Sequence, residues 1–442
     1  MQKILIHKLG PVEHCELEIS DFTVFTGPQA SGKSTIAKSV FFFKNIKNIL
    51  MEQFRKQQFL QVSEADDTIN LSFKKRIEKS IRSNFLQIFG TTWHMDETMQ
   101  LAFYYAENTF MKVSLRENMA APNYIWIEFS DNLNQFIKEL EKKSQRDFGM
   151  ASHDVLYAVR EELHDFFEDS AEIIYIPAGR SMITLLVLRR RHTSRKSYIY
   201  SSMDDAQKRN LDYCTQNYLE RILQLKPEFS FGLDQMIQNA IHLTDTKVDR
   251  QQMLELSELM KAILQGEYRN IEGEERLQVS ENKYVKINFA SSGQQEVVWI
   301  LNVVFYYLLY NQKAFFIIEE PESHLFPNAQ KLIAEFISMA QNGKNQIFIT
   351  THSPYILGSI NNMLYADKIA KYVDQSKLEK IISRNKWMKF SDFAAYYIKD
   401  GEIISCSDQE FQSIENEVID GASEDINRDF EKMVLLKEMY EH

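Results

Sequence analysis

Residues 27–34 read GPQASGKS and fit the pattern GxxxxGK[ST]. Phe22–Thr26, just before them, is rich in β-branched and aromatic residues, which favour a strand. After them, apolar residues at positions 36, 40, 43, 46 and 50 recur at helical spacing. A loop between a strand and a helix can wrap backbone N–H groups around phosphate oxygens, and the helix adds the positive end of its dipole. The stretch therefore predicts a phosphate-binding loop in an α/β fold.

Each part of this loop has a distinct chemical task. Gly32 permits close approach of the backbone, Lys33 can reach the β- and γ-phosphates, and Ser34 can ligate Mg²⁺. The residues expected to bind the cofactor here are Gly27, Pro28, Gln29, Ala30, Ser31, Gly32, Lys33, Ser34 and Thr35.

A second motif, FFIIEEPE at residues 315–322, places two acids at the end of an apolar run. Such a run predicts a central strand, and ligands of open α/β sheets bind at the carboxyl ends of the strands. Glu319 is the candidate for a Mg²⁺-linked carboxylate, and Glu320 can polarise the water that attacks a γ-phosphate. Strands that end in solvated acids are common, but the pairing with a phosphate loop favours the catalytic interpretation.

Two shorter motifs complete the set. Residues 290–296, ASSGQQE, form on their own an ordinary helix cap, with a serine before the first turn and an acid within it. Residues 350–353, TTHS, place His352 after the next predicted strand, and a lone histidine is more often an ordinary polar residue than a catalytic one. The order phosphate loop, Ser-Gly-Gln turn, acidic strand end and histidine is the motif order of ABC-type ATPases.

The chain resembles the AAA15/AAA21-type, OLD-like and RecF-like branch of the ABC ATPases. Three stretches carry the resemblance: residues 9–35, LGPVEHCELEISDFTVFTGPQASGKST; residues 319–327 and 348–357, EEPESHLFP and FITTHSPYIL; and the tail from residue 394, AAYYIKDGEIISCS, with EVIDGASEDINRDF at 417–430. The resemblance covers about the first 50 and the last 160 residues. It also extends to the stand-alone ATPase subunits of bacterial anti-phage defence systems of the Septu and PARIS types.

The resemblance implies ATP and Mg²⁺ as cofactors, with Lys33 and Ser34 as the Walker A residues. Glu320 matches the catalytic glutamate and His352 the switch histidine, whereas Glu319 stands where many ABC proteins have aspartate. The signature stretch corresponds to Ser291, Ser292, Gly293 and Gln294.

In that family, the residues that Ser291 and Gly293 match cap the γ-phosphate bound by the opposite protomer, so the resemblance implies a head-to-tail dimer or a higher oligomer. Phe326 replaces the usual aspartate of the D-loop, and no residue is assigned to the Q-loop.

The expected fold is α/β: an ABC-ATPase head with a mixed sheet around the P-loop helix and a large, mostly helical insertion between Walker A and the signature motif. We assign residues 1–50 and 286–442 to the head, 51–180 to a lobe of strands with a helical insertion, and 181–285 to a helical lid. Within the insertion, Tyr104–Leu115, Tyr124–Phe129 and Glu172–Ile176 are predicted strands, and Asp131–Glu168 and most of residues 181–266 are predicted helical. Ser423 is a candidate cap for a last helix.

The composition indicates in which cellular compartment we expect the protein. The 442 residues include three cysteines and no CxxC pair, which argues against a disulfide framework or a zinc knuckle. The apolar run Val297–Tyr310 is too short to span a bilayer, and residues 1–10 show no secretion leader, so we expect a cytoplasmic protein without membrane contact.

Charge is unevenly distributed along the chain. Residues 408–442 contain eleven acids and three bases and hold −8 of the net charge of −11. Bulk attraction to nucleic acid is therefore not expected. The basic cluster Arg189–Lys196, preceded by Arg180 in the string PAGRS, is either a local contact for a phosphate backbone or a solvated, ion-pairing surface.

No effector motif accompanies the predicted ATPase. The chain has no Asp-x-Asp pair after His352, as a Toprim nuclease would need, and no Arg-x4-His of the HEPN type. A sensor or scaffold that controls a separate nuclease or toxin is the first interpretation. A RecF-like DNA-repair ATPase and an ATP-locked scaffold with negligible turnover are the alternatives.

Overall fold

The computed structural model describes residues 2–59, 71–118, 121–146, 153–186, 211–243, 249–342 and 345–415, together with 428 and 430–433. Two predicted features lie largely or wholly outside these residues. The basic cluster Arg189–Lys196 is not among them, and of the helix expected after Ser423 only residues 428 and 430–433 are described, as helical.

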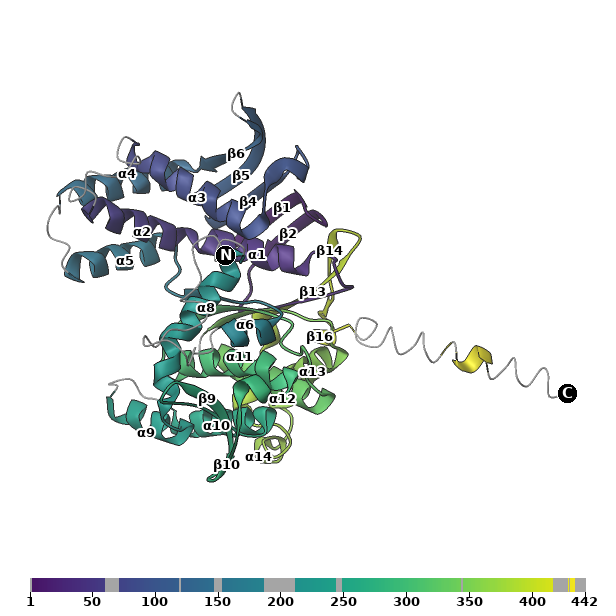
Figure 1. The fold of residues 1–442 in the computed structure, drawn as a ribbon. Helices are drawn as coiled ribbons and strands as arrows, with labels where there is room; N and C mark the ends of the chain where they lie inside the picture. Colours follow the sequence, from purple (N-terminus) through teal and green to yellow (C-terminus); the bar gives the residue numbers. More distant parts are fainter. Residues whose placement is uncertain are drawn as a thin grey trace.

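One eleven-stranded sheet organises the molecule, in the order β6-β5-β4-β1-β2-β14-β13-β3-β12-β11-β7 (Figure 1). Its strands are β1 (Lys3–Leu9), β2 (Val12–Glu18), β3 (Phe22–Thr26), β4 (Gln100–Ala106), β5 (Thr109–Asn118), β6 (Ala121–Phe129), β7 (Glu172–Ile176), β11 (Ala314–Glu319), β12 (Gln346–Thr350), β13 (Phe393–Lys399) and β14 (Glu402–Ser405). The strands β13, β3, β12, β11 and β7 are parallel to one another, whereas β6, β5, β4, β1 and β2 form an antiparallel wing. β14 joins the two parts, since it is antiparallel to β13 and parallel to β2.

Both faces of the parallel part are buried. In β11, Phe315 and Ile317 join the apolar core that contains α1, while Phe316 and Ile318 join the core on the opposite face. Successive side chains of a strand point to opposite faces, so a strand between two cores must be apolar throughout. This requirement explains why the continuous apolar runs identified β3, β7, β11 and β12 correctly.

Helices cover the two faces in separate groups (Figure 1). One group packs with the antiparallel wing: α1 (Lys33–Lys44), α2 (Ile46–Phe59), α3 (Phe73–Phe89), α4 (Asp131–Arg146) and α5 (His153–Phe166). The other includes α8 (Tyr213–Leu225), α9 (Leu233–Leu243), α10 (Arg250–Leu264), α11 (Ser292–Leu309), α12 (Pro327–Asn342) and α13 (Pro354–Ile369). Two shorter helices are α6 (Arg180–Leu186) and α14 (Gln375–Leu378).

The predicted fold class is confirmed: a mixed sheet surrounds the helix after the phosphate loop, and a mostly helical segment separates that loop from the Ser-Gly-Gln turn. Two local predictions were incomplete. Tyr104–Leu115 is not one strand, because a turn at residues 107–108 separates β4 from β5. The pattern also missed a three-stranded antiparallel sheet of β8 (Glu267–Ile271), β9 (Glu274–Ser280) and β10 (Lys283–Lys286). These strands are short and mostly polar, so their alternation carries little hydrophobic signal.

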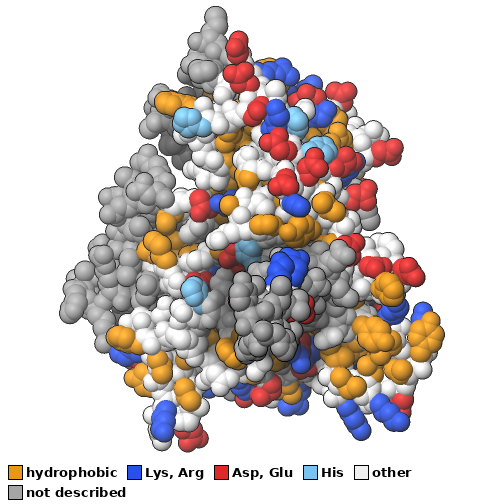
Figure 2. All heavy atoms as spheres, turned by 90° about the vertical axis from the view of Figure 1, so that its right-hand side faces the viewer, with side chains coloured by type: hydrophobic (Ala, Val, Ile, Leu, Met, Phe, Trp, Pro, Cys, Tyr) orange, Lys and Arg blue, Asp and Glu red, His pale blue; other side chains and the backbone are white. Residues whose placement is uncertain are grey.

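The surface that carries α13 and β14 mixes side chains of both charges with exposed hydrophobic groups (Figure 2). Exposed hydrophobic side chains of these two elements include Tyr365 on α13 and Ile404 on β14. Among the described residues, no helix has both the length and the apolar character needed to cross a bilayer.

Candidate active site

The phosphate loop adopts backbone angles that require glycine at two positions. Gly27 has φ 142°, and a Cβ there would lie 2.5 Å from the carbonyl oxygen of Ile398. Gly32 has φ 109°, and its Cβ would lie 2.6 Å from the Cγ2 atom of Val12. Both angles are in the region that side-chain-bearing residues rarely adopt. The loop is therefore shaped by its contacts with β13 and with the β1–β2 turn.

Lys33 directs its ammonium group into this loop. Its Nζ donates to the carbonyl oxygens of Gly27 at 3.0 Å and Pro28 at 2.7 Å, and lies 3.5 Å from Ser31 Oγ. Burial lowers the pKa of Lys33, while the charges of Glu320 and Glu322 oppose that shift. The loop thus holds a positive charge at its centre and presents the first turn of α1 without any acidic side chain, which suits an anion.

Glu319 ends β11 with a buried carboxylate. Its Oε2 accepts from the backbone N–H of Ala178 at 3.2 Å, whereas Oε1 has no hydrogen-bond partner among the described residues. Burial, followed by the charge of Glu319 and its hydrogen-bonding interaction with the Tyr175 hydroxyl, raises the pKa of Tyr175 well above the usual value. A buried, unpaired carboxylate oxygen is a group that a hard cation such as Mg²⁺ would satisfy. Glu319 therefore fits the role of a metal-linked carboxylate.

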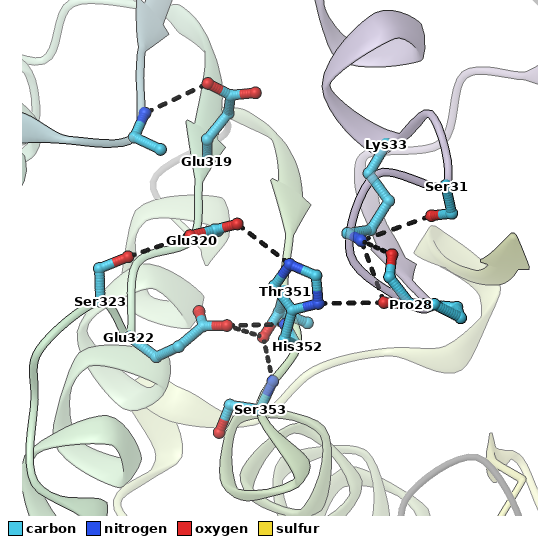
Figure 3. A network of polar contacts seen from close by, with 12 residues as sticks. Pro28, Ser31, Lys33, Glu319, Glu320, Glu322, Ser323, Thr351, His352 and Ser353 are labelled. Atoms are coloured by element: carbon cyan, nitrogen blue, oxygen red, sulfur yellow. Dashed lines mark hydrogen bonds and ion pairs between the residues drawn. The ribbon is translucent and has the colours of Figure 1, made fainter. Parts of the chain in front are cut away.

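Glu320 and His352 form a hydrogen-bonded pair beside the phosphate loop (Figure 3). Glu320 Oε1 lies 3.0 Å from His352 Nε2, and His352 Nδ1 lies 3.0 Å from the carbonyl oxygen of Gly27. The imidazole of His352 therefore lies between the phosphate loop and the Glu320 carboxylate and contacts both. The hydrogen bond from His352 is the main reason that the pKa of Glu320 is lowered, with a smaller contribution from Ser323. Glu320 is thereby kept ionised.

Glu322 holds this pair in place, a role that the sequence did not indicate. Its Oε1 accepts from Thr351 Oγ1 and from the backbone N–H of His352, both at 2.7 Å. Burial raises the pKa of Glu322, and the two donors oppose the shift. Glu322, two residues after Glu320, thus fixes the backbone that carries the His352 side chain (Figure 3).

Arg180 forms a second support that sequence reasoning missed. It is fully buried and donates to the carbonyl oxygens of Glu319 at 2.6 Å, Glu320 at 2.8 Å and Pro177 at 2.7 Å, while its Nε donates to the carbonyl oxygen of Glu296 at 2.8 Å. The Glu296 carboxylate in turn accepts from the backbone N–H groups of Arg180 and Ser181, both at 2.8 Å. Arg180 is therefore no part of an exposed basic cluster; it joins the acidic strand end to α11.

The Ser-Gly-Gln turn lies at the start of α11, against the segment that follows Glu322. Ser291 and Gln294 form a capping box at the start of α11, the ordinary helix cap that the sequence also allowed. Gly293 is required there because a Cβ would lie 2.5 Å from the carbonyl oxygen of His324. With Ser291, Gly293 and Gln294, the exposed Phe326 lines a cavity of about 380 Å³.

The structure brings together Lys33, Glu320 and His352, with Glu319 on the adjoining backbone. No hydrogen bond or ion pair within the described ranges joins Ser291, Ser292, Gly293 or Gln294 to that group. Ser34 is exposed and Thr35 half-buried on the first turn of α1.

Comparison with known proteins supplies the family. A model of the AAA ATPase domain matches residues 1–357. Solved structures with a similar fold include an Smc head bound to the C-winged helix domain of ScpA, with 14% identity, a TM-score of 0.42 and coverage of 92% of this chain and 98% of that one. A second is an Smc head domain with an extended coiled coil, bound to the C-terminal domain of ScpA derived from Pyrococcus furiosus, with 13% identity, a TM-score of 0.39 and coverage of 97% of this chain and 100% of that one. A third is the SMC head domain from Thermotoga maritima, with 11% identity, a TM-score of 0.35 and coverage of 91% of this chain and 97% of that one.

Among curated proteins the search found no match. The family model, by contrast, spans most of the sequence and includes the phosphate loop, the acidic strand end and His352. The chain therefore belongs to the AAA ATPase domain family.

Proposed function

We propose that the protein binds Mg-ATP and hydrolyses it to ADP and phosphate at the edge where Lys33, Glu320 and His352 meet. The observation that carries this proposal is the chain of contacts from the loop carbonyl of Gly27 through His352 to Glu320. It puts a carboxylate of lowered pKa next to a loop shaped for phosphate. Membership of the AAA ATPase domain family supports nucleotide binding.

Each residue would have one task. The N–H groups of the loop and Lys33 bind the β- and γ-phosphates, and Ser34 and Glu319 hold Mg²⁺, which neutralises charge on the phosphates when bound. Glu320 accepts a hydrogen bond from the attacking water and orients it. His352 keeps Glu320 ionised through its hydrogen bond and holds that carboxylate next to the loop through its contact with the carbonyl oxygen of Gly27.

Two substitutions test this assignment. Lys33→Ala should abolish ATP binding, whereas Glu320→Gln should bind ATP and lose turnover by roughly 10²- to 10⁴-fold, because the water-polarising group is gone. Glu410→Gln, at an exposed acid, is the control for the loss of one negative charge. ATPase activity of Glu320→Gln equal to that of the parent would refute the catalytic assignment. A burst of hydrolysis without turnover in the parent would favour the ATP-locked scaffold.

We further propose that the turn at residues 291–294 completes the site of a second copy in a head-to-tail dimer. Its position on a separate cavity supports this arrangement. Lys33→Ala chains mixed with Ser291→Arg chains should regain ATPase activity, since a mixed dimer has one site with both elements intact. Activity that stays absent at every mixing ratio, after exchange of subunits, would contradict a shared site.

The cellular role we propose is that of a cytoplasmic sensor or scaffold in a bacterial defence system, controlling a separate nuclease or toxin. Its support is the resemblance to stand-alone ATPase subunits of such systems. Residues 1–50 and 286–442 would form the ATPase head, and the lobes 51–180 and 181–285 would contact the effector, with Arg189–Lys196 available for nucleic acid. Co-expression with neighbouring genes should yield an ATP-dependent complex. Purified protein that cuts DNA or RNA by itself, in a manner lost in Lys33→Ala, would contradict a separate effector.

A further inference from the structure

Residues 371–389, which follow α13 and include α14, form a basic surface that no role assigned above uses. They contain six bases and two acids, in a chain whose net charge is −11. Lys377, Lys380 and Arg384 are exposed, and none of them forms an ion pair with another residue that the structure describes. The surface therefore has a surplus of positive charge that is available to an acidic partner.

This basic surface also offers apolar contacts. Tyr372 and Ile381 are 74% and 84% exposed. Arg384 and the buried Trp387 line an adjoining cavity of about 780 Å³. The acids that line the same cavity are Asp21, Asp367 and Asp392. The surplus of positive charge thus belongs to the basic surface and not to the cavity, and exposed apolar side chains among bases suit a partner that is both acidic and apolar.

The cavity lies at the edge of the sheet opposite the candidate active site. Asp21 and Asn345, which line it, directly precede β3 and β12. Lys33 and Glu320, by contrast, follow the carboxyl ends of β3 and β11. An occupant of the basic surface therefore does not touch the site proposed for ATP, and the inference holds whether or not the chain hydrolyses ATP.

The last part of the chain leaves the body of the molecule beside α13. A hairpin of β15 (Ser407–Asp408) and β16 (Ser413–Ile414) packs against that helix. The Asn361 side chain of α13 accepts from the backbone N–H of Ile414 at 2.7 Å and donates to its carbonyl oxygen at 3.1 Å. Residues 416–442 therefore start beside the helix that leads into the basic surface.

The sequence of this acidic segment, residues 416–442, complements the basic surface. It contains eight acids and three bases, and Ile426, Phe430 and Met433 recur at helical spacing. Phe430 and Met433 are described, as helical, and they are 62% and 60% exposed at a place that stands clear of the sheet and its helices (Figure 1). A helix this short is marginal in water by itself, so its apolar side needs a surface to pack on.

The acidic segment is long enough to reach the basic surface. The 27 residues from 416 to 442 would span about 40 Å as a helix, at about 1.5 Å per residue. The 16 residues of α13 span about 24 Å by the same measure. Because the segment is attached to the body, its effective concentration at the surface is of millimolar order, and weak contacts suffice to hold it there.

We propose that the acidic segment docks on the basic surface of its own chain. Phe430 and Met433 then pack on Tyr372, Ile381 and the mouth of the cavity. The acids of the segment lie close to Lys377, Lys380 and Arg384. The docked segment covers the apolar groups that are otherwise exposed at the end of the molecule opposite the antiparallel wing (Figure 1).

Zero-length cross-linking tests this proposal in the full chain, without added nucleotide. A carbodiimide joins a lysine to a carboxylate only where the two side chains are in contact, and mass spectrometry identifies the joined peptides. A mixture of unlabelled and isotope-labelled chains separates links within one chain from links between two chains. We expect links within one chain, from the acids of residues 416–442 to Lys371, Lys377, Lys380 and Lys389.

Two double variants, one on each side of the contact, should lower the yield of these links. Phe430→Ser with Met433→Ser removes the apolar anchors and should lower the yield by about fivefold or more. Its control is Phe231→Ser, at an exposed phenylalanine before α9, which should leave the yield unchanged. All of the substituted side chains are exposed, so the fold is not at risk.

The second double variant, Lys380→Glu with Arg384→Glu, reverses charge on the basic surface. It should lower the yield at the remaining lysines of that surface, because the acids of the segment are then repelled. Lys142→Glu, at an exposed lysine of α4, is its control and should leave the yield unchanged.

Three results would overturn the proposal. Links between labelled and unlabelled chains would mean that the basic surface takes the acidic segment of a second copy. Links in the parent that reach Lys142 as often as the lysines of the basic surface would mean that the segment has no docking site. A yield that neither double variant lowers would show that the named side chains do not hold the segment.

Discussion

Replacement of Arg180 by methionine should damage catalysis and stability by different amounts. The substitution keeps much of the buried volume but removes every donor that reaches the carbonyl oxygens of Pro177, Glu319 and Glu320. It also leaves the buried Glu296 carboxylate without its cationic partner. Loss of one member of a buried pair costs about 3–5 kcal/mol in free energy of unfolding. Because Glu296 retains two backbone donors, we expect about 3 kcal/mol, the lower end of that range.

Catalysis should fall as well, because Glu319 and Glu320 lose the contacts that fix their backbone. Urea unfolding measures the first effect, and the kcat for ATP measures the second under conditions where the variant remains folded. Arg250→Met, at an exposed arginine at the start of α10, is the control for loss of a positive charge. Arg180→Lys should recover part of the stability, since one ammonium cannot reproduce the planar fork.

The double variant Arg180→Met with Glu296→Gln separates the two effects. Removal of the unpaired charge should restore part of the free energy of unfolding, because the amide oxygen can still accept one backbone donor. The kcat should stay low, because the carbonyl oxygens of Glu319 and Glu320 still lack their donors. If kcat recovers together with stability, Arg180 serves folding alone and the positioning role is wrong. Additive losses of stability would refute the pairing of Arg180 with Glu296.

Two further outcomes follow from the geometry of the loop and the catalytic pair. In His352→Asn the pKa of Glu320 should rise toward its usual value, so the acid limb of the kcat–pH profile should move to higher pH; an unmoved limb would contradict the pairing. The limb moves in this direction because His352 lowers the pKa of Glu320 in the folded protein, so the carboxylate stays ionised to lower pH. Without His352 the carboxyl takes up its proton at a higher pH. Gly27→Ala should lose ATP binding, because its Cβ would meet the Ile398 carbonyl at 2.5 Å, whereas Gly358→Ala in α13, with nothing within 4 Å, should bind ATP like the parent; equal binding by both would show that the loop accommodates a side chain.

The parts of the fold that the sequence predicted are those governed by local rules. Central strands such as Phe22–Thr26 are buried on both faces, so they appear as continuous apolar runs. The strand–loop–helix order around Lys33 is also determined locally, because the two glycines that shape the loop, Gly27 and Gly32, lie within eight consecutive residues. Short, polar strands such as β8–β10 lack that signal, and the pattern left them unassigned.

The supports of the site depend instead on contacts between distant parts of the chain. Arg180 and Glu296 are 116 positions apart, and although Glu296 ends the ASSGQQE stretch, nothing in the sequence indicates that Arg180 is its partner. The one signal in the sequence was the arginine of PAGRS, four residues after a buried strand, because an arginine that is buried there needs backbone carbonyls or a carboxylate as partners. The role of Glu322 could not be predicted for the same reason. Its partners, Thr351 and the backbone of His352, follow β12 and reach Glu322 only in the folded chain.

Two segments outside the four sequence motifs lie close to the candidate site: one follows β7 and the other follows α3. Ala178 and Arg180, after β7, hold the side chain of Glu319 and the backbone of Glu319 and Glu320. His94, in the segment after α3, lines a cavity of about 440 Å³ that Thr35, in the first turn of α1, also lines. The segment between the motifs therefore contributes both to the acidic edge and to the surroundings of the helix that follows the phosphate loop. Under the proposed function, whatever binds this segment and shifts it must change nucleotide affinity, and by linkage the nucleotide must change affinity for that partner by the same factor. Within the proposed function, this reciprocity is the physical means by which ATP binding and hydrolysis would control a bound effector.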